Sequence, residues 1–276
     1  EYEEWVSAIN SSSGAPVWTK LVYEHRPGDL GVDTSGTVTT TADRAYVTLP
    51  NGRVDALGLA RGNVQWRSPV LSGCSLSAPS LSGSLAVVDG GGAYVTALST
   101  ATGQVAWTAD PGGSGCTTGS GELYLPAISG ATVYAGTGDG IAALGLTSGN
   151  LLWQTTSPAN AYMPFSVTKN AVLVSGSSGD NYSLEAFSPS TGNLLWQQAL
   201  TDAVGSLATF GGLTWTMQAP SGDEPQEAAA FDADTGRLLF STGLLATDSQ
   251  YLSPVVDAGH VYVNTGSELE CLALPS

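Results

Sequence analysis

The amino-acid sequence predicts an all-β fold, a β-propeller built from four-stranded antiparallel blades. Three observations predict it: one residue spacing recurs six times, each copy contains a short run of β-prone residues, and glycine-containing turns separate those runs. Repetition with a period of some tens of residues is typical of solenoids, propellers and arrays. Units made of several short strands favour the propeller among these architectures.

The recurring spacing consists of a glycine, an aromatic residue four positions after it, and an alanine six positions before it. The glycine and aromatic pairs are Gly14/Trp18, Gly62/Trp66, Gly103/Trp107, Gly149/Trp153, Gly192/Trp196 and Gly236/Phe240. The alanines are Ala8, Ala56, Ala97, Ala143, Ala186 and Ala230. Successive aromatic residues are 48, 41, 46, 43 and 44 positions apart. A constant unit with loops of variable length accounts for these differences.

Each unit also contains a short β-prone run before its alanine. The runs are residues 45–48, 85–88, 132–135, 171–174, 213–216 and 260–263. They are rich in β-branched and aromatic residues and are bounded by Gly, Asn, Asp or Ser, as strands are. The repeat is therefore built from strands.

One unit, interpreted in full, shows four strands. They are expected at residues 124–128, 132–136, 140–146 and 150–154, with glycine-containing turns at 137–140 and 147–150. Glycine supplies the positive φ that such turns need. Four short antiparallel strands make one propeller blade. The aromatic residue is then expected to pack between adjacent blades, and the alanine to lie where neighbouring sheets approach closely.

Two segments, residues 139–153 and 231–240, resemble the pyrroloquinoline-quinone (PQQ)-like repeat. Its tail has a small residue, Leu, an Asp-rich turn, Thr-Gly and then Trp, and Asp232, Thr235 and Gly236 fit that pattern. The resemblance covers almost the entire chain. It implies a propeller, and members of this family more often have seven or eight blades.

The two ends of the chain predict how a ring would close. We expect one propeller domain over residues 1–276, with repeat tails ending near 18, 66, 107, 153, 196 and 240. Residues 251–276 supply three strands of a last blade, which residues of about 5–18 would complete, because pairing removes open sheet edges. Six blades are favoured by this count. Residues 5–9 are an extra third-strand copy, which is either a fifth strand or a sign that the natural ring is larger.

The charge balance limits the partners. Lys and Arg number 8 against 24 Asp and Glu, which gives a formal net charge of −16. Such a field repels phosphate backbones, so no nucleic-acid partner is expected. A cationic peptide, a cell-wall polymer or a divalent cation fits the sign better, although acidic surfaces also serve solubility alone.

The location is expected to be extracytoplasmic. No apolar run reaches the roughly 18 residues that a membrane-spanning helix needs, so no direct membrane insertion is expected. The start, Glu1 to Glu4, lacks the basic residues of a signal peptide. Few lysines and many Ser, Thr and Gly residues suggest a mature or excised soluble domain outside the cytoplasm.

Enzymatic chemistry is not expected. The resemblance implies that quinoprotein dehydrogenases of this family carry a disulfide between adjacent cysteines over the cofactor, a bound Ca²⁺ and an aspartate base. Here Cys74, Cys116 and Cys271 are not adjacent, so neither PQQ nor Ca²⁺ is expected as a cofactor. A hydrolase needs a base beside its nucleophile, but His260 is expected to open a strand and His25 to lie in a solvated connection. No metal site is expected.

Two cysteines are a disulfide candidate. Cys74 follows Trp66 by eight residues and Cys116 follows Trp107 by nine, so they occupy near-equivalent positions in neighbouring blades. Matched positions do not ensure the short Cα separation that a disulfide needs, so unpaired thiols are the alternative. Cys271 replaces the repeated alanine and is expected to be a buried free thiol.

A ligand site is expected at the mouth of the channel. Tyr124, Tyr162 and Tyr251 recur at related positions, with Glu122 and Asp202 nearby. An aromatic, hydroxyl-bearing rim suits a sugar, a peptide or a small amphiphile. Ordinary packing along the axis is the alternative.

The function favoured by these observations is non-catalytic ligand binding. Resemblance to actinobacterial members of the family implies a sensor domain tethered to a membrane-anchored serine/threonine kinase, with a small molecule, a cell-wall fragment or a peptide as ligand. The first alternative is a scaffold for protein assembly, like the outer-membrane assembly lipoprotein of the family. The second alternative is a PQQ-dependent oxidoreductase.

Overall fold

The computed structural model describes most of the chain. The described residues are 3–25, 37–72, 76–90, 94–112, 125–137, 140–157, 165–178, 181–200, 207–218, 227–242, 254–257, 260–264 and 269–273. All regular structure in these ranges is β-strand. The chain divides into two compact units, one of Glu1–Gly138 with Leu144–Leu151 and one of Asp139–Ala143 with Leu152–Ser276.

The strands follow one another in short hairpins. They are β1 (Glu3–Ile9), β2 (Pro16–Glu24), β3 (Val38–Thr40), β4 (Arg44–Leu49), β5 (Arg53–Gly58), β6 (Val64–Arg67), β7 (Ser80–Ser82), β8 (Leu85–Asp89), β9 (Val95–Ser99), β10 (Val105–Ala109), β11 (Ala127–Ser129), β12 (Thr132–Thr137), β13 (Gly140–Gly145), β14 (Leu151–Thr156), β15 (Ser166–Val167), β16 (Val172–Ser178), β17 (Asn181–Phe187), β18 (Leu194–Leu200), β19 (Ala208–Phe210), β20 (Leu213–Gln218), β21 (Glu227–Asp232), β22 (Leu238–Ser241), β23 (Val255–Asp257), β24 (His260–Asn264) and β25 (Leu269–Ala273). Every β-prone run of the sequence falls in or beside the second strand of a sheet, namely β4, β8, β12, β16, β20 and β24.

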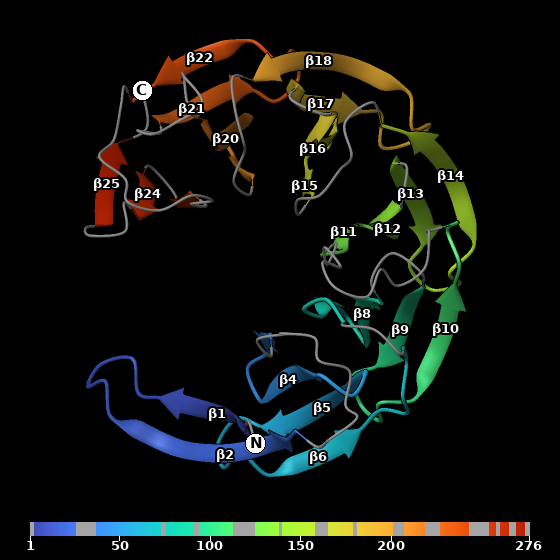
Figure 1. The fold of residues 1–276 in the computed structure, drawn as a ribbon, viewed down its shortest axis with the longest axis vertical. Coiled ribbons are helices and arrows are strands. Elements are labelled where there is room, and N and C mark those ends of the chain that lie inside the picture. Colours follow the sequence, from blue (N-terminus) through green and yellow to red (C-terminus); the bar gives the residue numbers. More distant parts are fainter. Residues whose placement is uncertain are drawn as a thin grey trace. The chain divides into compact units, whose positions relative to one another are not determined.

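The strands form the blades of a β-propeller, which confirms the predicted fold class. Four-stranded sheets are formed by β3 to β6, β7 to β10, β11 to β14, β15 to β18 and β19 to β22, each paired in chain order. Figure 1 shows the strands of each sheet lying side by side in that order. The first strand of each sheet is short, and the fourth strand is its free edge.

The ends of the chain form two incomplete sheets. β1 pairs with β2 in a two-stranded sheet, and β23, β24 and β25 form a three-stranded sheet. β1 is therefore a third strand and β2 a fourth strand, as the repeat predicts. The sharing of one closing blade by the two ends, and the count of six blades, remain predictions.

The alanine and the aromatic residue of each repeat are cross-strand partners. The strand registers pair Ala8 with Trp18, Ala56 with Trp66, Ala97 with Trp107, Ala186 with Trp196 and Ala230 with Phe240. The register shifts directly after the alanine in all five of these pairs. Such a bulge lets the third strand curl into the tail turn, which explains the constant distance from alanine to glycine.

The tail glycine closes that turn. In the turn between β5 and β6, the amide of Gly62 donates to the carbonyl of Gly58 at 2.8 Å, and Gly62 has a φ of +65°. The same bond from a glycine to the carbonyl four residues earlier recurs at Gly14, Gly103, Gly149, Gly192 and Gly236. All six have positive φ, a conformation in which other residues are strained.

Five of the six tail glycines, all except Gly14, also lie against the tryptophan of the preceding fourth strand. A Cβ placed on Gly103 would lie 2.3 Å from Cε3 of Trp66, and the equivalent distances for Gly62, Gly149, Gly192 and Gly236 are 2.5 to 2.6 Å. The tryptophan Nε1 then donates to a carbonyl of the same neighbouring turn, from Trp18 to Leu59, Trp66 to Thr100, Trp107 to Leu146 and Trp153 to Pro189, at 2.7 to 2.9 Å. The prediction that the aromatic residue packs between blades is confirmed.

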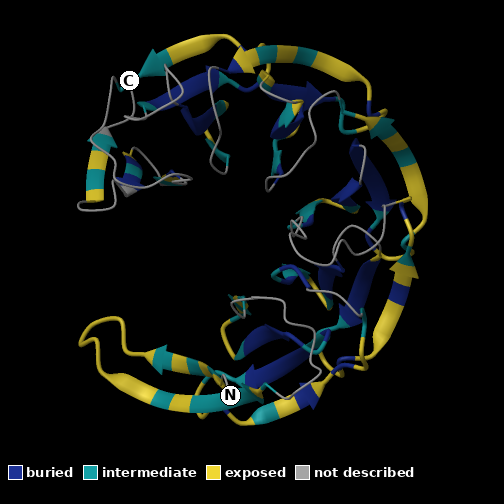
Figure 2. Ribbon diagram, in the orientation of Figure 1, coloured by how far each residue is buried: buried dark blue, intermediate teal, exposed yellow. Residues whose placement is uncertain are grey.

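The core lies between successive sheets of each unit. In the first unit, Tyr46 and Ala56 of one blade pack with Ala86 and Leu98 of the next. In the second, Leu184 packs with Phe231. Figure 2 shows that the second and third strands are mostly buried, whereas the fourth strands alternate between exposed and partly buried residues. A fourth strand packs on one face only, so its pattern has the two-residue period.

One prediction is wrong in this part of the chain. Cys271 is exposed rather than buried. Its neighbour Leu272 packs against the cluster around Trp215 and Val261. Because successive side chains of a strand point to opposite faces, Cys271 points away from that cluster.

Candidate functional site

The site residues predicted from the sequence are not tested by the structure. Those predicted for the channel mouth, Tyr124, Tyr162, Tyr251, Glu122 and Asp202, all lie outside the described residues. The same holds for the disulfide candidates Cys74 and Cys116. Both assignments remain predictions.

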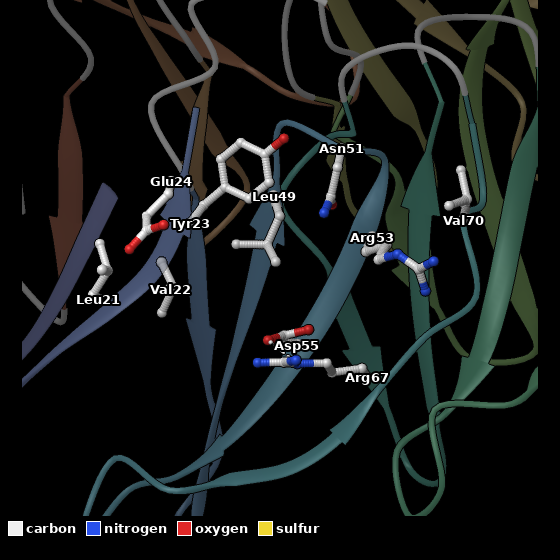
Figure 3. Close-up of a pocket in the computed structure, with 10 residues that line it drawn as sticks. All are labelled: Leu21, Val22, Tyr23, Glu24, Leu49, Asn51, Arg53, Asp55, Arg67 and Val70. Carbon is white, nitrogen blue, oxygen red and sulfur yellow. Dashed lines mark hydrogen bonds and ion pairs between the residues drawn. The ribbon is translucent and has the colours of Figure 1, made fainter. Parts of the chain in front are cut away.

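A groove in the first unit is the candidate site that the described residues form. It encloses a cavity of about 740 Å³ between β2 and the blade β3 to β6, and ten residues line it: Leu21, Val22, Tyr23, Glu24, Leu49, Asn51, Arg53, Asp55, Arg67 and Val70. This volume is in the range of small-molecule pockets. Figure 3 shows Asp55, Arg53 and Arg67 on one side and the residues of β2 on the other.

The fold positions this groove through the length of β2. This strand continues for six residues beyond Trp18, up to Glu24. Trp18, Val22 and Tyr23 pack against the buried cluster that contains Val47 and Leu49. The apolar contact fixes the distance between β2 and its neighbouring blade, so the polar side chains at the end of the groove face each other across a defined gap.

Asp55 is the buried charge of the groove. Its residue is only 1% exposed, and Nε of Arg67 donates to its Oδ2 at 3.1 Å from the directly opposite position of β6. Burial raises the pKa of the Asp55 carboxyl, and the charges of Arg67, Arg53 and Lys20 oppose this rise. The second oxygen, Oδ1, is buried and has no hydrogen-bond partner among the described residues.

The turn between β4 and β5 adds a second acceptor. Oδ1 of Asn51 is also buried without a hydrogen-bond partner among the described residues. The neighbouring Arg53 is held in place because its Nη1 donates to the carbonyl of Ser68 at 2.7 Å. Two acceptor oxygens and two guanidinium groups thus line the same cavity. A buried acceptor without a donor is unfavourable, which makes the groove a place where a ligand or water would bind.

In a second blade, the residue directly before the repeated alanine is also a buried carboxylate, but its hydrogen bonds differ. Glu185 directly precedes Ala186, as Asp55 precedes Ala56, and Gln197 lies opposite it as Arg67 lies opposite Asp55. Glu185 is fully buried and accepts from Gln197 Nε2 at 3.0 Å, Ser183 Oγ at 3.2 Å and Ser157 Oγ at 2.6 Å. Both of its oxygens are therefore paired.

The difference between the two blades comes from the preceding fourth strand. Ser157 follows Trp153 by four residues, and the residue four positions after Trp18 is Val22. Valine has no hydroxyl. The hydrogen bond that Ser157 donates to the second carboxylate oxygen of Glu185 therefore has no counterpart at Asp55. The repeat alignment contained this signal: the position before the alanine is charged only at Asp55 and Glu185 among the six copies. The pattern of recurring aromatic residues does not include this position.

His25 is engaged by the hairpin of β1 and β2. Its Nε2 lies 3.2 Å from Oε1 of Glu4, and its ring meets the edge of Tyr23 at a centroid distance of 5.1 Å. Burial raises the pKa of Glu4, and His25 opposes this rise through its hydrogen bond and charge. His260 opens β24, as predicted.

Two kinds of feature are absent from the described residues. They contain no group of three or more His, Cys, Asp or Glu side chains arranged to hold a metal ion. They also contain no helix long and apolar enough to cross a membrane.

Comparison with known proteins places the chain in a family. A curated relative, the polyvinylalcohol dehydrogenase of Sphingopyxis sp. (strain 113P3), is 26% identical over an alignment 259 residues long, gaps included, and the match covers 85% of this chain. The chain spans only 37% of that relative's length.

Among solved structures, BamB from Moraxella catarrhalis matches with a TM-score of 0.64 and 19% identity, over 94% of this chain and 77% of that protein. The computationally designed Ika8 protein matches with a TM-score of 0.70 and 16% identity, over 88% of this chain and 72% of Ika8. Both likenesses concern the fold. The family model described as outer membrane protein assembly factor BamB matches residues 2–179 and 180–274, and the chain therefore belongs to that family.

Proposed function

We propose that this propeller is a non-catalytic scaffold that binds other proteins during the assembly of outer-membrane proteins, outside the cytoplasm. The observation that carries the proposal is the family membership, because the matched segments span almost the entire chain. An assembly factor needs surfaces that dock partners rather than a reaction centre. The fourth strands supply such surfaces.

The fourth strands combine a free edge with exposed leucines. Leu194 and Leu195 of β18 are 47% and 51% exposed, and the pairs Leu151/Leu152 of β14 and Leu238/Leu239 of β22 are exposed in the same way. In each strand the pair directly precedes the tail aromatic residue. An edge strand offers unpaired backbone groups, and a partner strand can add to it. The apolar side chains would strengthen that pairing.

Site-specific photo-crosslinking in the native host tests the scaffold. A photoreactive amino acid replaces Leu195 in the full-length protein, and crosslinked products are identified by mass spectrometry. We expect crosslinks to proteins of outer-membrane assembly. The matched control is the same probe at Ser84, an exposed residue of the turn between β7 and β8. Products that are identical at both positions, or none at Leu195, would contradict the proposal.

A second candidate function is ligand sensing, as in kinase-linked sensor domains. The groove beside Asp55 favours it, since two buried acceptors line a cavity of small-molecule size. A ligand that binds only the folded chain raises its thermal stability. Loss of that shift on replacing a groove residue would tie the binding to this site.

We further propose that the chain works without PQQ and without Ca²⁺. Its three cysteines, Cys74, Cys116 and Cys271, contain no adjacent pair. Dye reduction with added PQQ, Ca²⁺ and polyvinyl alcohol is the test, chosen for the dehydrogenase relative. We expect no reduction above that of a heat-denatured sample, and catalytic turnover would overturn the proposal.

A further inference from the structure

We propose that the groove beside Asp55 binds a neutral, hydroxyl-rich ligand, namely a short oligosaccharide or a comparable polyol chain. The inference deepens the second candidate function, ligand sensing, and rests on it. Three observations carry it: the charge balance of the lining, the two acceptors without donors, and the mixture of polar and apolar walls.

The lining carries equal numbers of opposite charges. Glu24 and Asp55 supply two carboxylates, and Arg53 and Arg67 supply two guanidinium groups. A cationic ligand would meet both arginines and Lys20, which already act on Asp55. An anionic ligand would meet both carboxylates and two acceptor oxygens that have no hydrogen to donate. The charges therefore favour a neutral ligand.

The hydrogen-bonding groups point to hydroxyls. Oδ1 of Asp55 and Oδ1 of Asn51 need donors. Each guanidinium has five N–H donors, of which the described contacts use Nε of Arg67 and Nη1 of Arg53. The remaining N–H groups can donate to a ligand oxygen; the Arg67 side chain is 62% exposed, so such an oxygen would replace water there. A hydroxyl both donates and accepts through one oxygen, so neighbouring hydroxyls on one ligand satisfy both kinds of partner.

The internal comparison supports the same chemistry. At the equivalent position of the other unit, the donor to the second carboxylate oxygen of Glu185 is a hydroxyl, Oγ of Ser157 at 2.6 Å. Val22 leaves that place without a hydroxyl in the groove. A ligand hydroxyl would supply to Asp55 the bond that Ser157 supplies to Glu185.

The apolar wall fits the carbon skeleton of such a ligand. Val22, Leu49 and Val70 line the cavity together with the ring of Tyr23. Figure 3 shows the Tyr23 ring beside Leu49, and both belong to one packed cluster. Aromatic and aliphatic side chains with a few placed polar groups are typical of small-molecule pockets.

Ligand-observed saturation-transfer NMR tests the proposal on the whole chain. The probes are maltotriose, cellotriose, tri-N-acetylchitotriose and a short polyvinyl alcohol, and the comparison probes are a trilysine and a triglutamate peptide. We expect at least one hydroxyl-rich probe to bind and neither peptide to bind in the groove. The sugar and polymer probes distinguish the two sources of the same hydroxyl chemistry.

Two variants separate binding from folding. Asn51→Ala removes an acceptor that lacks a partner among the described residues, so the fold should keep its stability while the affinity falls about tenfold, the effect of one good hydrogen bond. Asp55→Asn should weaken binding further. Glu185→Gln is the control, since it changes the equivalent carboxylate of the other unit, and it should leave affinity unchanged.

Several outcomes would overturn the proposal. They are binding of a charged peptide with loss on Asn51→Ala, an affinity for sugar that Asn51→Ala leaves intact, or no binding of any hydroxyl-rich probe. If a peptide binds in the groove, ligand sensing survives and only the ligand class is wrong. If none of the probes binds, the ligand class is wrong. The proposed scaffold function is tested separately, by crosslinking at Leu195.

Discussion

At the scale of single residues, the interlock between a tail glycine and the preceding tryptophan explains the strongest sequence signal. Five of the six tail glycines, all except Gly14, must satisfy two independent requirements: a positive φ and space for an indole ring against the Cα. Either would favour glycine, and together they allow no other residue without a shift of backbone or ring. The pattern recurs because the same contact recurs between blades.

Replacing Gly103 with alanine tests the interlock. The new methyl group would lie 2.3 Å from Trp66 Cε3 at a φ of +71°, so overpacking and backbone strain together should lower the free energy of unfolding by about 2 to 5 kcal/mol. Gly83→Ala is the control, since Gly83 has a φ of +55° and open space around its Cβ. It should lose only about 1 to 2 kcal/mol. Equal losses in urea denaturation would contradict the interlock.

The Asp55 carboxyl should make stability depend on pH. Its folded pKa is raised by burial, so the folded chain binds this proton more tightly than the unfolded chain does. The carboxyl's contribution to stability is then present below the unfolded pKa of about 4 and is lost as the pH rises through the folded pKa.

Asp55→Asn does not titrate at this position, so the free energy of unfolding of the native chain minus that of the variant should be larger near pH 4 than at pH 7. Urea denaturation at several pH values measures it. The opposite trend would mean that the attraction of Arg67 outweighs the burial of Asp55.

The residues that sequence alone could identify are those that repeat. Gly103 and Trp107 stand in six aligned copies, so their roles could be predicted. Asp55 could be distinguished in the repeat as a charged residue before the alanine. That its Oδ1 lacks a hydrogen-bond partner among the described residues could not be predicted, because this depends on Val22, a residue of another strand whose proximity only the fold reveals. The exposure of Cys271 was missed for a related reason, since which face of β25 is covered depends on packing.

At the scale of elements, four of the six fourth strands are joined to the next blade by one indole hydrogen bond. Four tryptophans, from Trp18 to Trp153, donate to a neighbouring carbonyl, but Nε1 of Trp196 is buried without a partner among the described residues. Phe240 takes the position in the sixth copy and has no donor at all. Ring packing is thus common to all copies, and the hydrogen bond is not.

The comparison of Trp107→Phe with Trp196→Phe measures that hydrogen bond. Both variants lose similar ring volume, but only the first leaves a carbonyl, that of Leu146, without its donor. Trp107→Phe should therefore be the more destabilising by about 1 to 3 kcal/mol in the free energy of unfolding. Equal effects in thermal or chemical denaturation would show that the indole N–H contributes nothing to blade packing.

Strand positions could be predicted well where a run is both β-prone and bounded by turns. The second strand β12 was expected at residues 132–136 and lies at Thr132–Thr137. The bulges after the alanines could not be predicted, because a register shift depends on the hydrogen bonds of the partner strand.

At the scale of the whole molecule, the charge of −16 sets how partners approach. It predicts association with a cationic peptide at low ionic strength, driven by the summed field rather than by one contact. The affinity for a polylysine peptide, measured by fluorescence anisotropy, should fall steeply as the salt concentration rises. Salt ions screen the electrostatic field and shorten its range. Duplex DNA should not bind at any salt concentration, and a mobility shift with DNA would contradict this expectation.

The propeller fold and the family could be predicted from six in-phase copies. A spacing that all six copies share can be recognised even though single residues and loop lengths differ between them. The number of blades could not. Five interfaces between successive sheets use the same glycine and tryptophan contact. A contact that is the same at each interface carries no information about the number of blades.

That uniformity has a consequence for how such chains grow. A duplicated repeat brings its own glycine for the tryptophan before it and its own tryptophan for the glycine after it. Gene duplication can thus insert or delete a blade without any new interface having to evolve. Variation that creates a function must then enter at positions outside the interlock, and the residue before each alanine, Asp55 in one blade and Glu185 in another, is one such position.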